Sequence, residues 1–178
     1  MTDPLPTIRL VRPALRLLDA ALEGDDALAG ALGHDVVAGW ATFTAALQST
    51  RDALASNRDA SAWGTRLFVA SEPRELVGWG GFKGPPKDGV LELGYEIAES
   101  RRGRGVATAA VRAMLAEAFT DQRVTTVIAH TLAERNASNR VLEKAGFEFA
   151  AEAKEDEEVV WRFSLARRDW RAPGVPSP

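Results

Sequence analysis

The sequence contains no cysteine, which excludes disulfide bonds, thiolate metal ligands and a cysteine nucleophile. It has no basic excess either. Its 25 acidic and 22 basic residues give a net charge of -3, so we expect no nucleic-acid partner. The two histidines, His34 and His130, lie too far apart in the chain to form a metal-binding motif, and no metal site is expected. Any catalysis must use other groups.

Long hydrophobic runs are also missing. No stretch approaches the length of a membrane-spanning helix, and the first residues lack the basic start and apolar core of a signal peptide. We therefore expect a cytoplasmic protein with no membrane partner. The 178 residues fit a single domain over 1–170, followed by a loose tail rich in proline and small residues at 171–178.

Residues 1–60 are expected to form a helical N-terminal part. The spacing of Leu15, Leu18 and Leu22 predicts one helix, and a short second helix is predicted over 27–32. A longer third helix would bury four residues: Trp40, Phe43, Leu47 and Leu54. These side chains could pack in the core or line a substrate pocket, and core packing is the favoured interpretation.

Residues 65–165 show the alternation of strands and helices that is typical of an α+β fold. A hairpin is predicted over 66–70 and 76–82, and residues 90–98 alternate strictly, with Glu92 and Glu96 on the polar face. The clearest helix follows, with apolar residues at Ala107, Ala110, Val111, Met114, Leu115 and Ala118. Next come a strand over 124–132, a helix over 138–145 closed by Gly146, and strands over 147–153 and 159–165.

The loop between the alternating strand and the clearest helix is the most informative segment. Gly103 and Gly105 let the backbone approach a ligand, and the start of the helix supplies partial positive charge. Three neighbouring arginines could add contacts to phosphates: Arg101, Arg102 and Arg104. The segment therefore predicts a pyrophosphate site, with a solvated basic loop as the alternative. It lacks the residues of a P-loop or a dinucleotide fingerprint.

Two motifs resemble those of the GNAT acetyltransferases. Arg102-x-x-Gly105-x-Ala107 resembles the donor-binding signature of the family, and Asn136 to Phe147 resembles its late motif, which ends in Glu-Lys-x-Gly-Phe. With the segment Leu91 to Tyr95, the chain looks most like the ribosomal-protein N-terminal acetyltransferases of the RimJ/RimL type. The resemblance covers 65–165 and implies a mixed, mostly antiparallel central sheet flanked by helices.

The resemblance also implies a reaction and a binding site. Acetyl would pass directly from acetyl-CoA, the co-substrate, to a primary amine of a small molecule or a protein N-terminus, without a metal. The strand at 90–98 would splay from the strand at 124–132, and the backbone of Tyr95, Glu96 and Ile97 would bind pantetheine. The remaining donor-binding residues would be Arg102, Gly103, Arg104, Gly105, Val106, Ala107, Thr108, Asn136 and Ser138. A homodimer is plausible for such a protein.

Two catalytic roles are assigned through the same resemblance. Glu92 would accept the proton of the acceptor ammonium through water, with Glu96 as a weaker rival and a solvent-facing structural role as the alternative. Leu142 occupies the position of the family's catalytic tyrosine, so Ser138 would stabilise the thiolate, unless it is the N-cap of its helix. His130 could reach the acetyl group, although a structural role is favoured. Alternatives to the enzyme are a catalytically idle CoA-binding domain and a structural protein.

Overall fold

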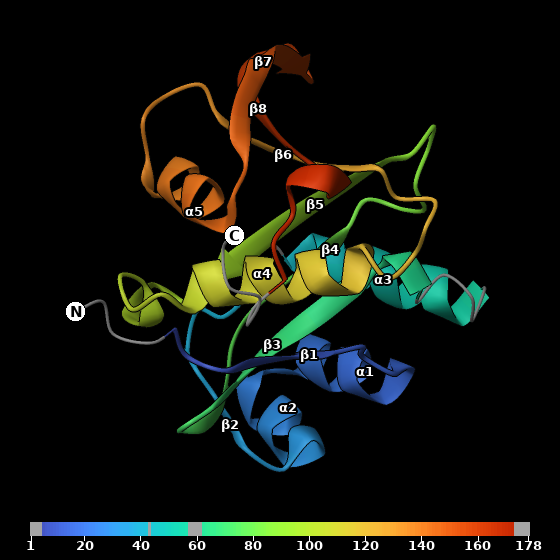
Figure 1. Ribbon diagram of the computed structural model, residues 1–178. Helices are drawn as coiled ribbons and strands as arrows, with labels where there is room; N and C mark the ends of the chain where they lie inside the picture. Colours follow the sequence, from blue (N-terminus) through green and yellow to red (C-terminus); the bar gives the residue numbers. More distant parts are fainter. Residues whose placement is uncertain (1–4, 43, 57–61, 173–178) are drawn as a thin grey trace.

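The computed structural model describes residues 5–42, 44–56 and 62–172. Its sheet has the order β1-β3-β4-β5-β6-β8-β7, with β2 paired to β4 (Figure 1). The pairs are antiparallel except for β2 with β4 and β5 with β6, so the expected α+β fold with a mixed, mostly antiparallel sheet is confirmed. The strands are β1 (Ile8–Val11), β2 (Asp35–Val36), β3 (Thr65–Ser71), β4 (Arg74–Phe82), β5 (Val90–Ile97), β6 (Thr126–Leu132), β7 (Glu148–Glu155) and β8 (Glu158–Ala166).

Helices cover the sheet and lie at its ends. In Figure 1, α1 and α2 (blue) lie at one end of the molecule and the β7–β8 hairpin projects at the other, with α4 between them. The helices are α1 (Leu15–Glu23), α2 (Asp25–Leu32), α3 (Thr44–Ser56), α4 (Val106–Ala118) and α5 (Ala137–Ala145), with short 3₁₀ turns η2 (Glu99–Arg101) and η3 (Arg167–Asp169). Every helix in the described part of the chain is too short or too polar to span a bilayer.

The sheet separates two hydrophobic clusters, and β3 shows why. Phe68 and Ala70 belong to the cluster with α4 and α5, whereas Leu67 and Val69 belong to the cluster with α1, α2 and α3. Because successive side chains of a strand point to opposite faces, both faces of β3 are buried. This accounts for its nearly continuous hydrophobic sequence.

The N-terminal part differs from the sequence expectation because it is only partly helical. β1 extends the sheet beside β3, pairing Ile8 with Ala70, and such a short strand gives too few residues for its period to be recognised. In α1 the buried residues are Leu17 and Leu18, while Leu15 and Leu22 are 36% and 38% exposed.

The third predicted helix begins later than expected. α3 starts at Thr44, and Trp40 precedes it in a turn, where its indole N–H donates to Asp25 at 3.0 Å. Trp40 and Leu47 are nevertheless buried, so the prediction that they pack in the core is confirmed. Leu54 is half-buried against the same cluster. Phe43 lies outside the described residues.

The feature that shapes the site is the incomplete pairing of β5 with β6. The two strands pair at Val90 with Thr126, Leu91 with Val127 and Glu92 with Ile128. β5 then continues along β4 as far as Ile97, and β6 continues along β8 as far as Leu132. The expected splay between these strands is therefore present, and it opens after Glu92.

Glycines in β4 allow the splayed part of β5 to lie close to its other neighbour. A Cβ at Gly78 would lie 2.2 Å from the Glu96 carbonyl oxygen, and one at Gly80 would lie 2.5 Å from that of Gly94. Both distances are far below van der Waals contact, so a side chain at either position would push the strands apart. These two glycines keep β5 against β4 while it separates from β6.

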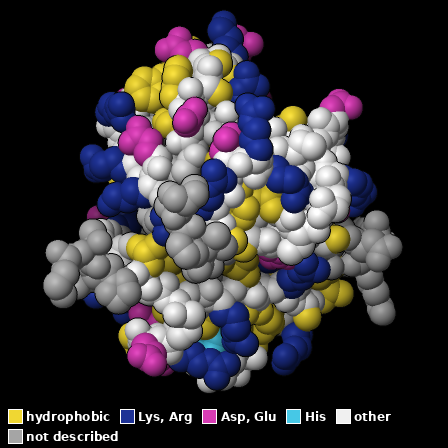
Figure 2. All heavy atoms as spheres, viewed as in Figure 1, with side chains coloured by type: hydrophobic (Ala, Val, Ile, Leu, Met, Phe, Trp, Pro, Cys, Tyr) yellow, Lys and Arg dark blue, Asp and Glu magenta, His cyan; other side chains and the backbone are white. Residues whose placement is uncertain are grey.

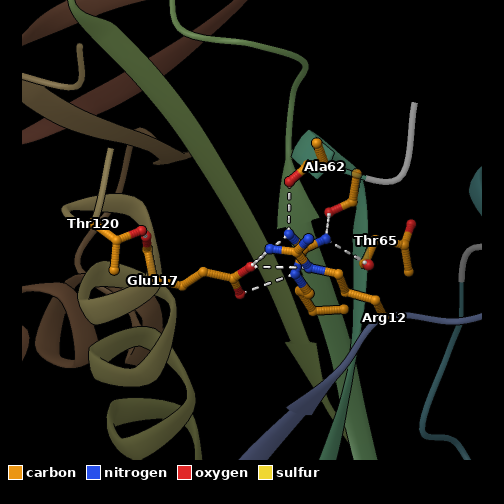
Figure 3. A network of polar contacts seen from close by, with 7 residues as sticks. Arg12, Ala62, Thr65, Glu117 and Thr120 are labelled. Atoms are coloured by element: carbon orange, nitrogen blue, oxygen red, sulfur yellow. Dashed lines mark hydrogen bonds and ion pairs between the residues drawn. The ribbon is translucent and has the colours of Figure 1, made fainter. Parts of the chain in front are cut away.

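A buried ion pair fixes α4 to the sheet. Arg66 of β3 is fully buried, and its guanidinium donates to Glu117 of α4 at 2.8 and 3.0 Å and to the carbonyls of Ala62, Gly64 and Thr65. Arg12, after β1, also pairs with Glu117. Figure 3 shows the Glu117 carboxylate reaching from the helix to these groups. The network joins β1, β3 and the last turns of α4.

The start of α5 is fixed by its N-cap. Asn136 is the N-cap residue, and its side chain accepts from the Asn139 backbone N–H at 3.1 Å while Asn139 accepts from the Asn136 N–H at 2.7 Å. The fully buried Asn139 also donates to Thr131 Oγ1 of β6 at 2.8 Å. Asn136, and not Ser138, is therefore the N-cap of α5.

We predict that Glu117→Gln lowers the free energy of unfolding by about 2 kcal/mol at neutral pH, because it weakens a charge-assisted contact to a buried guanidinium. Burial alone would raise the pKa of Glu117, but the hydrogen bonds from Arg66 and Arg12 outweigh it and hold the pKa below 4.5. The wild type's advantage should thus be full above pH 4.5 and disappear as the pH falls through the lowered pKa.

Urea denaturation of both proteins across this pH range measures the difference. The control is Arg12→Ala, which removes an exposed partner of the same carboxylate and should cost less than about 1 kcal/mol. A difference between wild type and Glu117→Gln that does not change with pH would contradict the assignment.

We predict that Asn136→Ala lowers the free energy of unfolding by about 1 kcal/mol, the usual cost of losing an N-cap side chain. Ser138→Ala should change it by no more than about 0.5 kcal/mol, because the Ser138 side chain does not cap the helix. Thermal and urea denaturation of both variants compares them. The opposite order of stabilities would return the capping role to Ser138.

Candidate active site

A cleft of about 660 Å³ lies where β5 and β6 separate. Its walls are the splayed ends of the two strands, the turn before α4 and the first turns of α4 and α5. The described residues that line it are Tyr95, Glu96, Ile97, Arg102, Gly103, Gly105, Val106, Ala107, Thr108, Thr131, Leu132, Glu134, Asn136, Ala137, Ser138, Arg140, Val141 and Lys144. Segments far apart in the sequence thus form one surface.

One end of the cleft can bind an anion. Gly103 and Gly105 have φ values of +74° and +77°, a left-handed conformation that allows the chain to turn into α4. The backbone N–H groups of Val106, Ala107 and Thr108 belong to the first turn of α4, where a helix offers no internal acceptor. No acidic residue occupies that turn, so its N–H groups and the helix dipole favour a negatively charged ligand.

The basic residues near this turn have different roles. Arg101 forms a two-pronged ion pair with the buried Glu75 at 2.5 and 2.8 Å, so the expectation that it contacts phosphate is replaced by a structural role. Arg102 lines the cleft, and its Nε donates to the Ile97 carbonyl at 3.2 Å. The described lining residues do not include Arg104. They do include Arg140 and Lys144 of α5, which the sequence reasoning had not selected.

Two hydroxyl groups meet across the cleft. The Tyr95 hydroxyl of β5 lies 3.2 Å from Ser138 Oγ at the start of α5. Burial raises the pKa of Tyr95 to about 12, although the hydrogen bond with Ser138 opposes the shift. The phenol therefore keeps its proton at neutral pH and can donate a hydrogen bond in the cleft. The sequence had suggested only a backbone role for Tyr95, whereas its side chain also supplies a phenol to the cleft.

The late-motif position where the family has its tyrosine is structural in this chain. Leu142 is fully buried in the cluster beneath α5 and cannot act at the cleft. Tyr95 and Ser138 are instead the two hydroxyl groups that the fold brings together here.

Glu92 lies at the last paired position of β5, on the face away from Tyr95, and meets three other side chains. Its Oε1 is 2.5 Å from Lys83 Nζ and 2.9 Å from His130 Nδ1. Glu155 Oε1 is 3.2 Å from each of the same two nitrogens. We call these four residues, Lys83, Glu92, His130 and Glu155, the charged cluster. The described lining of the cleft does not include Glu92, which lies beside its closed end.

The charged cluster keeps the Glu92 carboxylate ionised. Burial alone would raise the pKa of Glu92, but hydrogen bonds from Lys83 and His130 and the charges of both outweigh it, so the pKa lies below 4.5. For Lys83, burial would lower the pKa, but its bonds to Glu92 and Glu155 raise it above 10.5. At neutral pH, Glu92 is thus a carboxylate that can accept a proton once Lys83 moves aside.

Glu96, the rival carboxylate, is engaged elsewhere. It accepts from the Thr42 backbone N–H at 3.0 and 3.1 Å and from the Trp79 indole N–H at 3.0 Å. Both of its oxygens are used to join the splayed strand to the segment before α3. This arrangement favours Glu92 over Glu96 as the proton acceptor.

The structure places most of the site residues selected from the sequence around one cleft. All of the selected donor-binding residues except Arg104 line the cleft. Thr131 and Leu132 were missed, because nothing local marks where a strand loses its partner. Lys83 and Glu155 were missed because they approach Glu92 only through the fold. His130 was noted as a candidate, but its contact with Glu92 could not be foreseen.

Comparisons with known proteins agree with the fold. Residues 14–148 match the family model described as an acetyltransferase (GNAT) domain. A relative from Bacillus subtilis (strain 168), an uncharacterized N-acetyltransferase called YjdG, is 28% identical over 143 residues, which are 79% of this chain and 85% of that protein.

Solved structures show the same fold at low sequence identity. A spermidine N-acetyltransferase SpeG chimera from Vibrio cholerae and hSSAT is 13% identical, with a TM-score of 0.66 over 91% of this chain and 96% of its own. Mycobacterium smegmatis RimJ in complex with CoA-disulfide is 20% identical, with a TM-score of 0.65 over 90% and 82%. The chain therefore belongs to the GNAT acetyltransferase domain family and is an acyl-CoA-dependent acetyltransferase.

Proposed function

We propose that this protein transfers acetyl from acetyl-CoA to a primary amine and that the cleft between β5 and β6 is its donor site. The observation that carries the proposal is the splay after Glu92, which leads from the first turn of α4 toward the charged cluster. A long ligand with an anionic end and a reactive end fits such a path. The solved RimJ structure contains a CoA derivative, which supports the same class of ligand.

The donor's phosphates would bind at the start of α4. The N–H groups of its first turn can donate hydrogen bonds to the pyrophosphate oxygens, while Arg102, Arg140 and Lys144 supply positive charge along the cleft. The pantetheine arm would then lie between β5 and β6. Where a strand lacks a neighbour, its backbone N–H and C=O groups need other partners, and the amides of pantetheine can provide them beside Tyr95 to Ile97.

The chemical step requires a base and a donor of a hydrogen bond. The amine nitrogen attacks the thioester carbonyl, a C–N bond forms, and the C–S bond breaks to release the CoA thiolate. Glu92 accepts the proton of the acceptor ammonium through water. The Tyr95 and Ser138 hydroxyls stabilise the thiolate by donating hydrogen bonds, and the Tyr95 phenol stays neutral because its pKa is about 12. The thiolate then takes up, through water, the second proton that the acceptor nitrogen loses when the amide forms.

The acceptor class is proposed as a primary amine on a small molecule or at a protein N-terminus. The names of the similar proteins support both types, because one is a spermidine N-acetyltransferase and another, RimL, is named as a ribosomal L7/L12 alpha-N-protein acetyltransferase. The acceptor would approach from the face of the sheet that carries Glu92, opposite the donor's entry.

We predict that Ala107→Glu weakens acetyl-CoA binding at least about 10-fold. Ala107 lines the cleft in the first turn of α4, so a carboxylate there would repel the pyrophosphate, and a 10-fold loss of affinity corresponds to about 1.4 kcal/mol. Isothermal titration calorimetry with acetyl-CoA measures the affinity.

The matched control is Ala116→Glu, which adds the same charge to an exposed position of the same helix and should bind acetyl-CoA like the wild type. A glutamate at Gly105 would be a less suitable test than one at Ala107. The φ of Gly105 is +77°, and a Cβ there would lie 2.9 Å from the Leu5 side chain, so the substitution would strain the backbone. If Ala107→Glu and Ala116→Glu bind acetyl-CoA equally well, the donor binds elsewhere. If the wild type does not bind acetyl-CoA at all, the proposal is wrong.

We predict that Glu92→Gln lowers kcat for acetyl transfer by roughly 100-fold, the effect of losing a general base, without changing acetyl-CoA affinity. Tyr95→Phe should also lower kcat, because it removes one hydroxyl from the thiolate site. Thiol release from acetyl-CoA with a panel of primary amines measures the rates, and Glu152→Gln, an exposed carboxylate of β7, is the control.

Unchanged turnover in Glu92→Gln would assign the base to another group. Tight donor binding by the wild type without turnover of any amine would favour a catalytically idle CoA-binding domain.

A further inference from the structure

The charged cluster brings together three side chains of the kinds that bind transition metals. His130 of β6 contributes an imidazole nitrogen, and Glu92 of β5 and Glu155 of β7 each contribute a carboxylate oxygen. All three are half-buried, and the three atoms lie within 4.8 Å of one another. Three different strands hold them, so their backbone positions are fixed by the sheet.

We infer that Glu92, His130 and Glu155 form a binding site for a divalent transition metal ion, with Zn²⁺ as its best-suited ligand. The two carboxylates supply negative charge, and the imidazole favours Zn²⁺ over Mg²⁺ or Ca²⁺, which prefer oxygen ligands alone.

The distances suit a zinc ion after small movements of the side chains. His130 Nδ1 lies 2.9 Å from Glu92 Oε1 and 3.2 Å from Glu155 Oε1. Ligand atoms about 2.1 Å from a tetrahedral Zn²⁺ lie about 3.4 Å from one another. The carboxylates therefore need only rotate slightly, and the fourth position can be taken by water because the cluster is open to solvent.

A cationic side chain already pairs with both carboxylates of this arrangement. The Lys83 ammonium lies 2.5 Å from Glu92 Oε1 and 3.2 Å from Glu155 Oε1, between the two carboxylates. Its side chain is 56% exposed, so it can swing into solvent when a metal ion enters. Lys83 is thus an internal competitor for the site, and this role distinguishes the cluster from a group of surface acids without a preferred cation.

Metal binding would have a consequence for catalysis, which rests on the proposed function. A metal ion on Glu92 would occupy the carboxylate that accepts the proton of the acceptor, so Zn²⁺ would inhibit acetyl transfer. The ion would be an inhibitor and not a cofactor, because the transfer itself needs no metal.

Zinc binding should be measured directly, on the tag-free protein without acetyl-CoA, by competition with a chromophoric zinc chelator. We expect one Zn²⁺ per chain. His130→Ala and Glu155→Gln each remove a proposed metal ligand. Losing a residue that merely supports a ligand costs roughly 10- to 100-fold in metal affinity, so each variant should weaken Zn²⁺ binding by at least that factor. Lys83→Met should tighten binding, because it removes the competing ammonium.

Controls separate this site from other causes. His34→Ala and Glu152→Gln change the same residue types outside the cluster and should bind Zn²⁺ like the wild type. Tighter binding by Lys83→Met cannot arise from misfolding, which keeps the test decisive if another variant is unstable. No Zn²⁺ binding to the wild type, or equal binding in His130→Ala, would overturn the inference.

The outcome is independent of the proposed reaction. If zinc binds with this pattern but no amine is acetylated, the metal site stands and the proposed function fails. If amines are acetylated but zinc does not bind, the proposed function stands and the metal site is wrong.

Discussion

The separation of two neighbouring strands is the constraint on which the rest of the site depends. β5 and β6 share three paired positions and then follow different partners, β4 and β8. Gly78 and Gly80 make this possible on one side, because they let β5 lie against β4 at a distance that no side chain would permit. On the other side, Asn139 ties the start of α5 to Thr131 of the departing β6. The cleft is thus held open by packing and hydrogen bonds within the sheet and its helices.

The opening places different chemistry on its two faces. On the face of α4 and α5, the first turn of α4, Arg102 and Lys144 favour an anionic ligand, and the Tyr95 and Ser138 hydroxyls lie further in. On the opposite face, Glu92 is surrounded by Lys83, His130 and Glu155. A donor and an acceptor that approach from opposite faces would meet at the point where the strands part.

Charged side chains are widely distributed over the face of the molecule that Figure 2 shows. Basic side chains (dark blue) are spread over several parts of this face and alternate with acidic and hydrophobic ones. Hydrophobic side chains gather over the β7–β8 hairpin, where Phe149 and Val159 are 54% and 48% exposed. The hairpin also carries Glu155, so the same element that projects from the molecule completes the charged cluster.

Much of the fold and of the cleft could be predicted from the sequence, because those features are encoded locally. The alternation around Glu92, the glycines before α4 and the late motif each mark a short segment. Contacts between distant segments could not be predicted. The strand at Ile8 to Val11 is too short to show a period, Arg101 turns from the cleft to Glu75, and Lys83 reaches Glu92 through a hairpin. Whether Ser138 or Asn136 caps α5 could be decided only from the hydrogen bonds between Asn136 and Asn139.

A crystal structure of the protein with bound CoA would test the central claim most directly. The account predicts pantetheine between Tyr95 to Ile97 and Thr131 to Leu132, with the pyrophosphate on the N–H groups that begin α4 and the sulfur facing the Tyr95 and Ser138 hydroxyls. CoA bound at another surface, or β5 and β6 paired along their full length, would contradict it.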